Sequence, residues 1–207
     1  NEVAEFIYKR TYSRWLEDEA RREDWPETIE RFIGFIISER PDIPDKTISK
    51  IRKYMTEFGV MPSMRFLWAA GPAAKADNTC IYNCSFAKIN SVDAFAECLY
   101  VLMCGTGFGF SVEAEEVDKL PEVPEIKSGQ GLPKTLIDDS KAGWADSVKI
   151  LMGSLYDGQN VYFDYSAIRP EGARLLTMGG RASGPQPLVK LHDFIRETMH
   201  NAQGRKL

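Results

Sequence analysis

A change of hydrophobic pattern near residue 60 constrains the fold of this chain more than any other feature. Before it, apolar residues recur at the spacing of amphipathic helices in three segments. These segments run from Val3 to Trp15, from Ile29 to Ile36 and from Ile48 to Phe58. The third is predicted to end at Gly59, because glycine commonly follows the last turn of a helix. We therefore predict an N-terminal helical domain over residues 1–60.

After residue 60, extended and helical segments alternate. Strands are predicted over residues 81–86, 108–112 and 161–165, and helices over about 91–104, 144–155 and 188–199. The order strand, helix, strand, helix, strand, loop, helix favours an α/β domain over residues 61–207. An acidic stretch with prolines and glycines, from Glu113 to about Pro133, is predicted to be a surface excursion. Three strands are few for a stable sheet, so further sequence is expected to complete it.

Composition excludes several classes of partner. The chain has 207 residues, of which 43% are hydrophobic, so it can bury a substantial core. Its formal charge of −4 is spread without long blocks of one sign, which argues against binding to nucleic acid or to an anionic membrane surface. No apolar run approaches the roughly 18 residues that a membrane span needs, and the start lacks the features of a signal peptide. A cytoplasmic location is expected.

The four cysteines are too few and too clustered to hold a secreted fold together, so thiols in a reducing compartment are expected. On a strand, Cys80 and Cys84 would stand about 13 Å apart, beyond the roughly 7 Å limit for a disulfide. No metal site is predicted, because the two histidines lie far from the cysteines in the sequence. Cys98 and Cys104 are predicted to be core residues. For Cys84, spacing alone leaves both a buried structural role and a chemical role open.

Two glycine-rich segments could approach a ligand closely. Residues 104–110 contain three glycines, but a helix precedes them and a strand follows, which is the reverse of a dinucleotide-binding fingerprint. Close approach of the backbone to another ligand and a simple helix-to-strand turn both stay open. The segment 169–187 combines arginines, glycines and a serine just ahead of a helix, which suits a phosphate, although a surface loop is the alternative.

Four ordered blocks resemble the catalytic subunit of ribonucleotide reductases, most closely the monomeric class that depends on adenosylcobalamin. The blocks are Met61-Pro62-Ser63-Met64-Arg65-Phe66-Leu67-Trp68, Tyr82-Asn83-Cys84-Ser85-Phe86, Gly105-Thr106-Gly107-Phe108-Gly109-Phe110-Ser111-Val112, and Ile168 to Pro185. The resemblance implies a helical domain followed by the first part of a ten-stranded α/β barrel. It also implies reduction of ribonucleotides to deoxyribonucleotides by thiyl-radical chemistry, with adenosylcobalamin as cofactor and a thioredoxin-like protein or a dithiol as reductant.

The resemblance also implies roles for individual residues. Cys84 corresponds to one member of a redox-active cysteine pair whose partner is expected beyond residue 207. Ser63, Asn83, Cys84 and Gly107 correspond to substrate contacts. The segment 169–187 corresponds to a specificity loop that binds a deoxynucleoside triphosphate effector. Its candidate effector-binding residues are Arg169, Arg174, Gly179, Gly180, Arg181 and Ser183.

Some features separate this chain from the family pattern. In the monomeric class an insertion replaces the contacts of a partner subunit, and residues at about 113–160 occupy its place but are fewer than expected, so both a monomer and a dimer are considered. The thiyl cysteine and most of the cobalamin surface are expected later in the sequence, so the isolated chain is predicted to be inactive. A class with a separate radical-generating subunit and a split nucleotide-binding or regulatory fragment are the alternatives.

Overall fold

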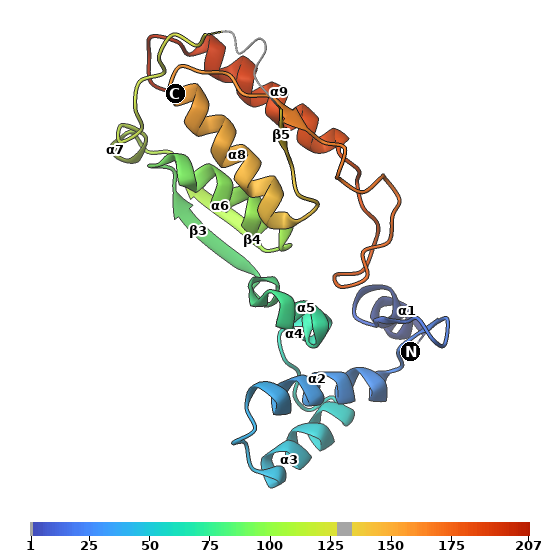
Figure 1. Cartoon of the computed structure of the whole chain (residues 1–207). Helices are drawn as coiled ribbons and strands as arrows, with labels where there is room; N and C mark the ends of the chain where they lie inside the picture. The colour runs from blue at the N-terminus through green and yellow to red at the C-terminus, as the bar shows by residue number, and fades with distance from the viewer. Residues whose placement is uncertain (1, 128–133) are drawn as a thin grey trace. The chain divides into compact units, whose positions relative to one another are not determined.

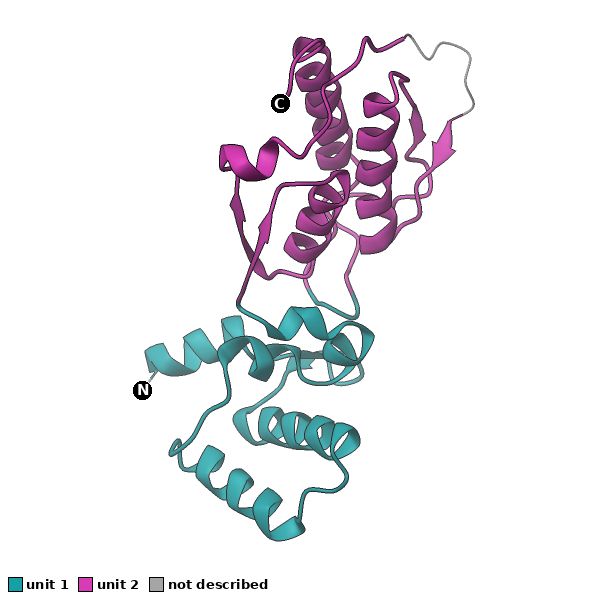
Figure 2. Cartoon of the chain, turned by 90° about the vertical axis from the view of Figure 1, so that its left-hand side faces the viewer, with its two compact units in different colours: residues 1–83, 176–179 teal, residues 84–175, 180–207 magenta. Residues whose placement is uncertain are grey.

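The computed structural model describes residues 2–127 and 134–207 (Figure 1). The chain divides into two compact units (Figure 2). Unit 1 comprises residues 1–83 and 176–179, and unit 2 comprises residues 84–175 and 180–207. The predicted domain boundary near residue 60 and the insertion at about 113–160 stay predictions, and part of that insertion lies outside the described residues.

Unit 1 is mainly helical, as the sequence predicts. Its elements are α1 (Glu2–Thr11), β1 (Trp15–Leu16), β2 (Arg21–Arg22), α2 (Trp25–Glu39), α3 (Asp45–Thr56), α4 (Met64–Ala69), α5 (Pro72–Ala76) and the 3-10 helix η1 (Asn78–Ile81). The first helix is shorter than predicted, because Trp15 lies in β1, which pairs with β2 in antiparallel register. The third predicted helix ends at Thr56, since Phe58 adopts a positive φ of 56°.

Helix α2 is the centre of unit 1. A capping box fixes its start, because the Asp24 carboxylate accepts from the Glu27 N–H while the Glu27 carboxylate accepts from the Asp24 N–H. Its buried face forms one core cluster with α3 and α4. The buried members of this cluster are Ile29, Phe32, Ile33, Ile48, Met55, Leu67 and Ala70.

Two short helical segments between residues 61 and 86 were not predicted from the sequence. Residues 64–69 form α4, because the Ser63 hydroxyl accepts from the Phe66 N–H at 3.2 Å and Leu67 is buried against the core. Residues 78–81 form η1, where the Asp77 carboxylate accepts from the Thr79 N–H. The predicted strand over 81–86 therefore begins only at Cys84. Both elements are shorter than two helical turns, so hydrophobic periodicity could not reveal them.

Unit 2 begins with a β-α-β unit. Strand β3 (Cys84–Lys88) pairs in parallel with β4 (Gly107–Ser111), and α6 (Val92–Met103) connects them. Parallel strands need such a crossover, and the alternation of strand and helix in the sequence predicted it. Gly105 ends α6 with a φ of 80°, and its N–H donates to the Leu102 carbonyl.

The rest of unit 2 packs helices around a second core. The elements are α7 (Ala114–Val117), β5 (Thr135–Leu136), α8 (Lys141–Tyr156), β6 (Phe163–Asp164) and α9 (Gln186–Asn201). Helix α8 lies between α6 and α9 (Figure 1) and supplies Val148, Leu151 and Leu155 to the core. The predicted strand 161–165 contributes only Phe163–Asp164, which pairs with β5. No helix among the described residues has the length and apolar character that crossing a membrane requires.

Candidate functional site

Cys84 and Gly107 stand side by side at the start of the two parallel strands of unit 2. They are register partners, and both are exposed. The hydroxyl of Ser85 donates to the Gly107 carbonyl at 3.0 Å, which fixes the two strand ends relative to each other. Because Gly107 has no side chain, a ligand can approach the backbone beside the Cys84 thiol. The structure thus leaves this thiol accessible rather than enclosed in an apolar interior.

The other three cysteines lie in different environments. All four are free thiols. Cys80 and Cys104 are fully buried, and the Lys141 ammonium lies 3.1 Å from the Cys104 sulfur. Cys98 is half-buried, and burial raises the pKa of its thiol. The core prediction is confirmed for Cys104, whereas Cys98 lies at the edge of a groove. Cys84 is thus the exposed thiol of the four, which suits exchange with an external dithiol.

Two of the predicted substrate contacts belong to unit 1. Ser63 is exposed and caps α4 through its oxygen, and a hydroxyl that accepts one hydrogen bond can still donate its own proton to a ligand. Asn83 is exposed and directly precedes Cys84 in the chain. An amide of this kind can both donate to and accept from a sugar hydroxyl. Both residues therefore present polar groups to solvent on unit 1.

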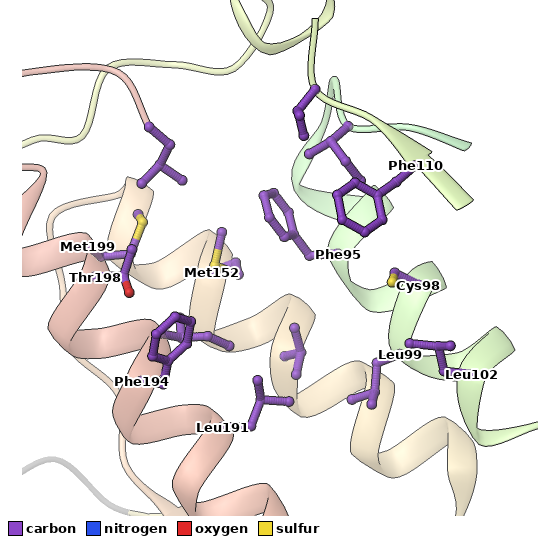
Figure 3. Close-up of a pocket in the computed structure, with 15 residues that line it drawn as sticks. Phe95, Cys98, Leu99, Leu102, Phe110, Met152, Leu191, Phe194, Thr198 and Met199 are labelled. Carbon is purple, nitrogen blue, oxygen red and sulfur yellow. The ribbon is translucent and has the colours of Figure 1, made fainter. Parts of the chain in front are cut away.

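An apolar groove of about 370 Å³ lies in unit 2 between α6, α8, α9 and the end of β4 (Figure 3). Phe95, Cys98 and Leu99 face it from α6, and Phe194 and Met199 face it from α9. Its lining is almost entirely apolar. A nucleotide needs convergent hydrogen-bond donors and charges, so this groove does not have the chemistry of the predicted substrate or effector site.

The segment 169–187, here called the 169–187 loop, folds as a hairpin. Its arms are joined by backbone bonds from the Ala182 N–H to the Ala173 carbonyl, at 2.7 Å, and from the Leu175 N–H to the Gly180 carbonyl, at 3.0 Å. Gly180, at the returning arm, has a φ of 88°, which a side chain would disfavour. The loop therefore has a defined backbone.

The candidate effector residues divide into two groups on this hairpin. Arg174 and Arg181 are exposed and form an antiparallel bridge, so their side chains leave the same face of the hairpin. Arg181 also donates to the Gly172 carbonyl at 2.9 Å. Arg169 instead forms an ion pair with Asp139 at 2.6 Å. Gly179 and Ser183 are exposed near the bridge. The bridge thus places two exposed, positively charged residues at paired positions of the hairpin.

One buried polar network was not foreseen from the sequence. His192, on α9, is fully buried, with its Nε2 3.0 Å from the Ser147 hydroxyl and its Nδ1 2.8 Å from the Tyr165 hydroxyl. Ser147 donates its proton to the Trp144 carbonyl, so Nε2–H donates to Ser147 and Nδ1 accepts from Tyr165. Burial lowers the pKa of His192 to about 4. This histidine is neutral and structural. Among the described residues, no group of three or more acidic, histidine or cysteine side chains could hold a metal ion.

Comparison with protein-family models identifies two segments. The model of the ribonucleotide reductase alpha domain matches residues 1–72. The model of the insertion domain of B12-dependent ribonucleotide reductase matches residues 123–199. Together the two matches cover the helical N-terminal segment and a later segment that contains α8 and the 169–187 loop and reaches into α9.

Curated relatives and a solved structure agree with these models. An adenosylcobalamin-dependent ribonucleoside-triphosphate reductase of Lactobacillus delbrueckii subsp. bulgaricus is 26% identical over 97% of this chain and 36% of its own length. The Euglena gracilis enzyme of the same name is 28% identical over 100% of this chain and 31% of its own length. A putative enzyme of this kind in Mycobacterium phage D29 is 29% identical over 95% of this chain and 33% of its own length. The chain thus spans about a third of the length of these relatives.

The crystal structure of a B12-dependent (class II) ribonucleotide reductase superposes on 98% of this chain with a TM-score of 0.83 and 26% identity, and the match covers 37% of that protein. The alignment with the Lactobacillus relative extends over 266 positions, more than the 207 residues of this chain, so this chain is shorter within the matched region. The predicted fold class is confirmed by this match. The chain belongs to the adenosylcobalamin-dependent ribonucleotide reductase family, and it matches the N-terminal part of those enzymes.

Proposed function

We propose that this chain is the N-terminal part of an enzyme that reduces ribonucleotides to deoxyribonucleotides. The observation that supports this most directly is the exposed thiol of Cys84 beside the open backbone of Gly107. Removing the 2′ hydroxyl of a ribose as water requires two electrons and two protons. A pair of thiols supplies both when it closes to a disulfide, and an external dithiol or thioredoxin-like protein reopens it. Cys84 is one thiol of that pair, and its partner lies outside this chain.

The substrate in this proposal is a ribonucleotide. Ser63 and Asn83 offer it hydrogen bonds, and Gly107 offers a backbone that a side chain does not obstruct. A cytoplasmic location, where such substrates and reductants occur, belongs to the same proposal. A monomer and a dimer both stay compatible with it, because the chain is shorter than its relatives within the matched region.

The proposed cofactor is adenosylcobalamin, which supplies a radical when its cobalt–carbon bond breaks. The groove of about 370 Å³ in unit 2 is too small to enclose a corrin ring with its adenosyl group. This groove is therefore not assigned to the cofactor, and no step of the proposal depends on a cofactor surface here. The family match is what supports this cofactor.

Nucleotide reduction in the longest native polypeptide that contains this sequence is the direct test. We expect deoxyribonucleotide formation with a dithiol to require adenosylcobalamin, and the isolated 207-residue chain to form none. Product is measured by chromatography of the nucleosides after dephosphorylation. Turnover without cobalamin would favour an enzyme with a separate radical-generating subunit. Turnover by the isolated chain would contradict the proposal that the second redox cysteine lies elsewhere.

The 169–187 loop is proposed to bind a deoxynucleoside triphosphate through Arg174 and Arg181. Replacing Arg181 by glutamine removes one charged donor, so we expect binding to weaken by roughly tenfold or more. Equilibrium dialysis of the chain with radiolabelled dATP, dGTP, dCTP and dTTP in turn measures this. Arg205→Gln is the matched control, since Arg205 is an exposed arginine of the same unit that lies outside the loop. Equal affinity of the Arg181 variant and the unmodified chain would rule out this role.

A further inference from the structure

The tip of the 169–187 loop is held by an arginine of the N-terminal segment. Residues 176–179 belong to unit 1, although both arms of the loop belong to unit 2 (Figure 2). Within unit 1, the Arg14 guanidinium donates from Nη1 to the Met178 carbonyl at 3.0 Å and from Nη2 to the Thr177 carbonyl. Two adjacent carbonyls thus share one planar fork, a geometry that lysine cannot reproduce.

Both the backbone N–H and the guanidinium of Arg14 have partners within unit 1. Its N–H donates to the Glu23 carboxylate at 3.1 Å. That carboxylate is buried and also accepts from the Thr28 hydroxyl at 2.8 Å and from Arg31 Nε at 2.7 Å. The guanidinium of Arg14 lies over the Trp68 ring, 5.2 Å from its centroid. A satisfied buried network of this kind holds a side chain in one geometry, so Arg14 presents a fixed fork to the loop tip.

The same network reaches the helix that Ser63 caps. Arg31 Nη1 donates to the carbonyls of Leu67 and Ala70, at 3.1 and 2.6 Å, at the end of α4. Trp68 lies in α4, and Met178 packs with it against the small-residue cluster of Ala69, Ala73, Ala74 and Cys80. The loop tip therefore contacts α4 both through Arg14 and through direct apolar packing, all within unit 1.

We infer that Arg14 is a positioning residue that couples the 169–187 loop to α4, and through α4 to Ser63. This inference rests on the proposed function, in which the loop binds an effector and Ser63 contacts the substrate. An effector that changes the loop then changes the position or mobility of α4, because the tip and the helix share Arg14, Trp68 and Met178. Coupling between two sites requires a physical connection of this kind.

Release of the loop tip is the first readout. Chymotrypsin cleavage after Leu176 is followed by mass spectrometry in the unmodified chain and in the Arg14→Met and Arg14→Lys variants. We expect roughly tenfold faster cleavage in Arg14→Met, because two hydrogen bonds to a charged donor are lost. A smaller increase is expected in Arg14→Lys, which keeps the charge and serves as the variant least disturbing to the fold. Arg40→Met is the matched control, since the Arg40 side chain forms an exposed ion pair with Asp42 in the same unit.

Transmission to α4 is the second readout. Hydrogen exchange of the amides of residues 66–70 is measured with and without the deoxynucleoside triphosphate that binds best. We expect the nucleotide to change this exchange in the unmodified chain and in Arg40→Met, and to leave it unchanged in Arg14→Met. If the role of Arg14 is purely structural, Arg14→Met changes the exchange rates of these amides relative to the unmodified chain by the same factor with and without nucleotide.

The two measurements test the role of Arg14 separately from the proposed effector site on the 169–187 loop. Cleavage of Arg14→Met at the rate of the unmodified chain would overturn the role of Arg14 at the loop tip, whether or not nucleotide binds. Nucleotide binding that leaves α4 exchange unaltered in the unmodified chain would overturn the coupling. Absence of nucleotide binding in the unmodified chain would instead count against the proposed effector site, while the cleavage measurement would still decide whether Arg14 holds the tip.

Discussion

Replacing Cys84 by serine is expected to abolish multiple-turnover nucleotide reduction in the native polypeptide that contains this sequence. A hydroxyl cannot form a disulfide, so the thiol pair can no longer supply the two electrons and two protons that loss of the 2′ hydroxyl as water requires. Groups that act as a unit lose nearly all function when one is removed, so a fall of roughly 10³-fold or more is expected. The measurement is dithiol-dependent formation of deoxyribonucleotide over many turnovers. Because Cys84 is exposed, the thermal unfolding midpoint is expected to stay unchanged.

Cys98→Ala is the matched control for this experiment. Cys98 is in the same unit, half-buried at the apolar groove, and outside the proposed chemistry, so near-normal turnover is expected. Alkylation of the native chain by iodoacetamide provides a second check. Cys84 is expected to react first, because Cys80 and Cys104 are buried and burial raises the pKa of Cys98. Full turnover in Cys84→Ser, or a Cys84 thiol protected from alkylation, would contradict the redox role.

Unit 2 is expected to lose stability in mild acid because of His192. Its pKa is lowered to about 4 by burial, with a contribution from Arg196, while an unfolded histidine titrates near 6.5. Between these values the unfolded chain binds a proton that the folded chain excludes, so the free energy of unfolding falls as the pH falls. The expected loss between pH 7 and pH 4 is on the order of 3 kcal/mol. Urea unfolding at several pH values, followed by circular dichroism, measures it.

Replacing His192 by alanine is expected to lower the free energy of unfolding of unit 2 and to remove the part of its pH dependence that this histidine causes. The change leaves a cavity beside Phe163 and deprives the Ser147 and Tyr165 hydroxyls of their partner, so a loss of about 3 kcal/mol at pH 7 is expected. His200→Ala, at an exposed position of the same helix, is the control and should keep the slope. The pKa of Glu116 is lowered to about 2, mainly by Lys119, so its contribution is lost chiefly below the histidine window. An unchanged slope in the His192 variant would refute this assignment.

Much of the fold could be predicted from local pattern. The periodic segments that became α2, α3, α6, α8 and α9 each bury one face, and a pattern long enough to show that face predicts a helix. The β-α-β unit followed from the alternation of element types. Helix α4 and η1 were missed, because six or four residues are too short to show a period. The strand at 161–165 was overestimated, since pairing with β5 reaches only two of its residues.

Part of the candidate site could likewise be predicted from the sequence, and part could not. The residues at positions 63, 83, 84 and 107 could be selected because ordered motifs resemble a family, which the comparisons then supported across the chain. Spacing alone could not choose between a structural and a chemical Cys84. Nor could it reveal that Arg169 pairs with Asp139, which lies 30 residues away, or that Arg14 bonds to carbonyls at residues 177 and 178.

By itself, the sequence determined where the longer helices form and which thiol belongs to a recognisable motif, since both depend on neighbouring residues. The tertiary structure alone decided which thiol reaches solvent, which arginines face each other, and which histidine is deprived of water. Exposure and pKa depend on what the rest of the chain places around a side chain, and contacts between residues 14 and 178 or 147 and 192 leave no trace in local spacing.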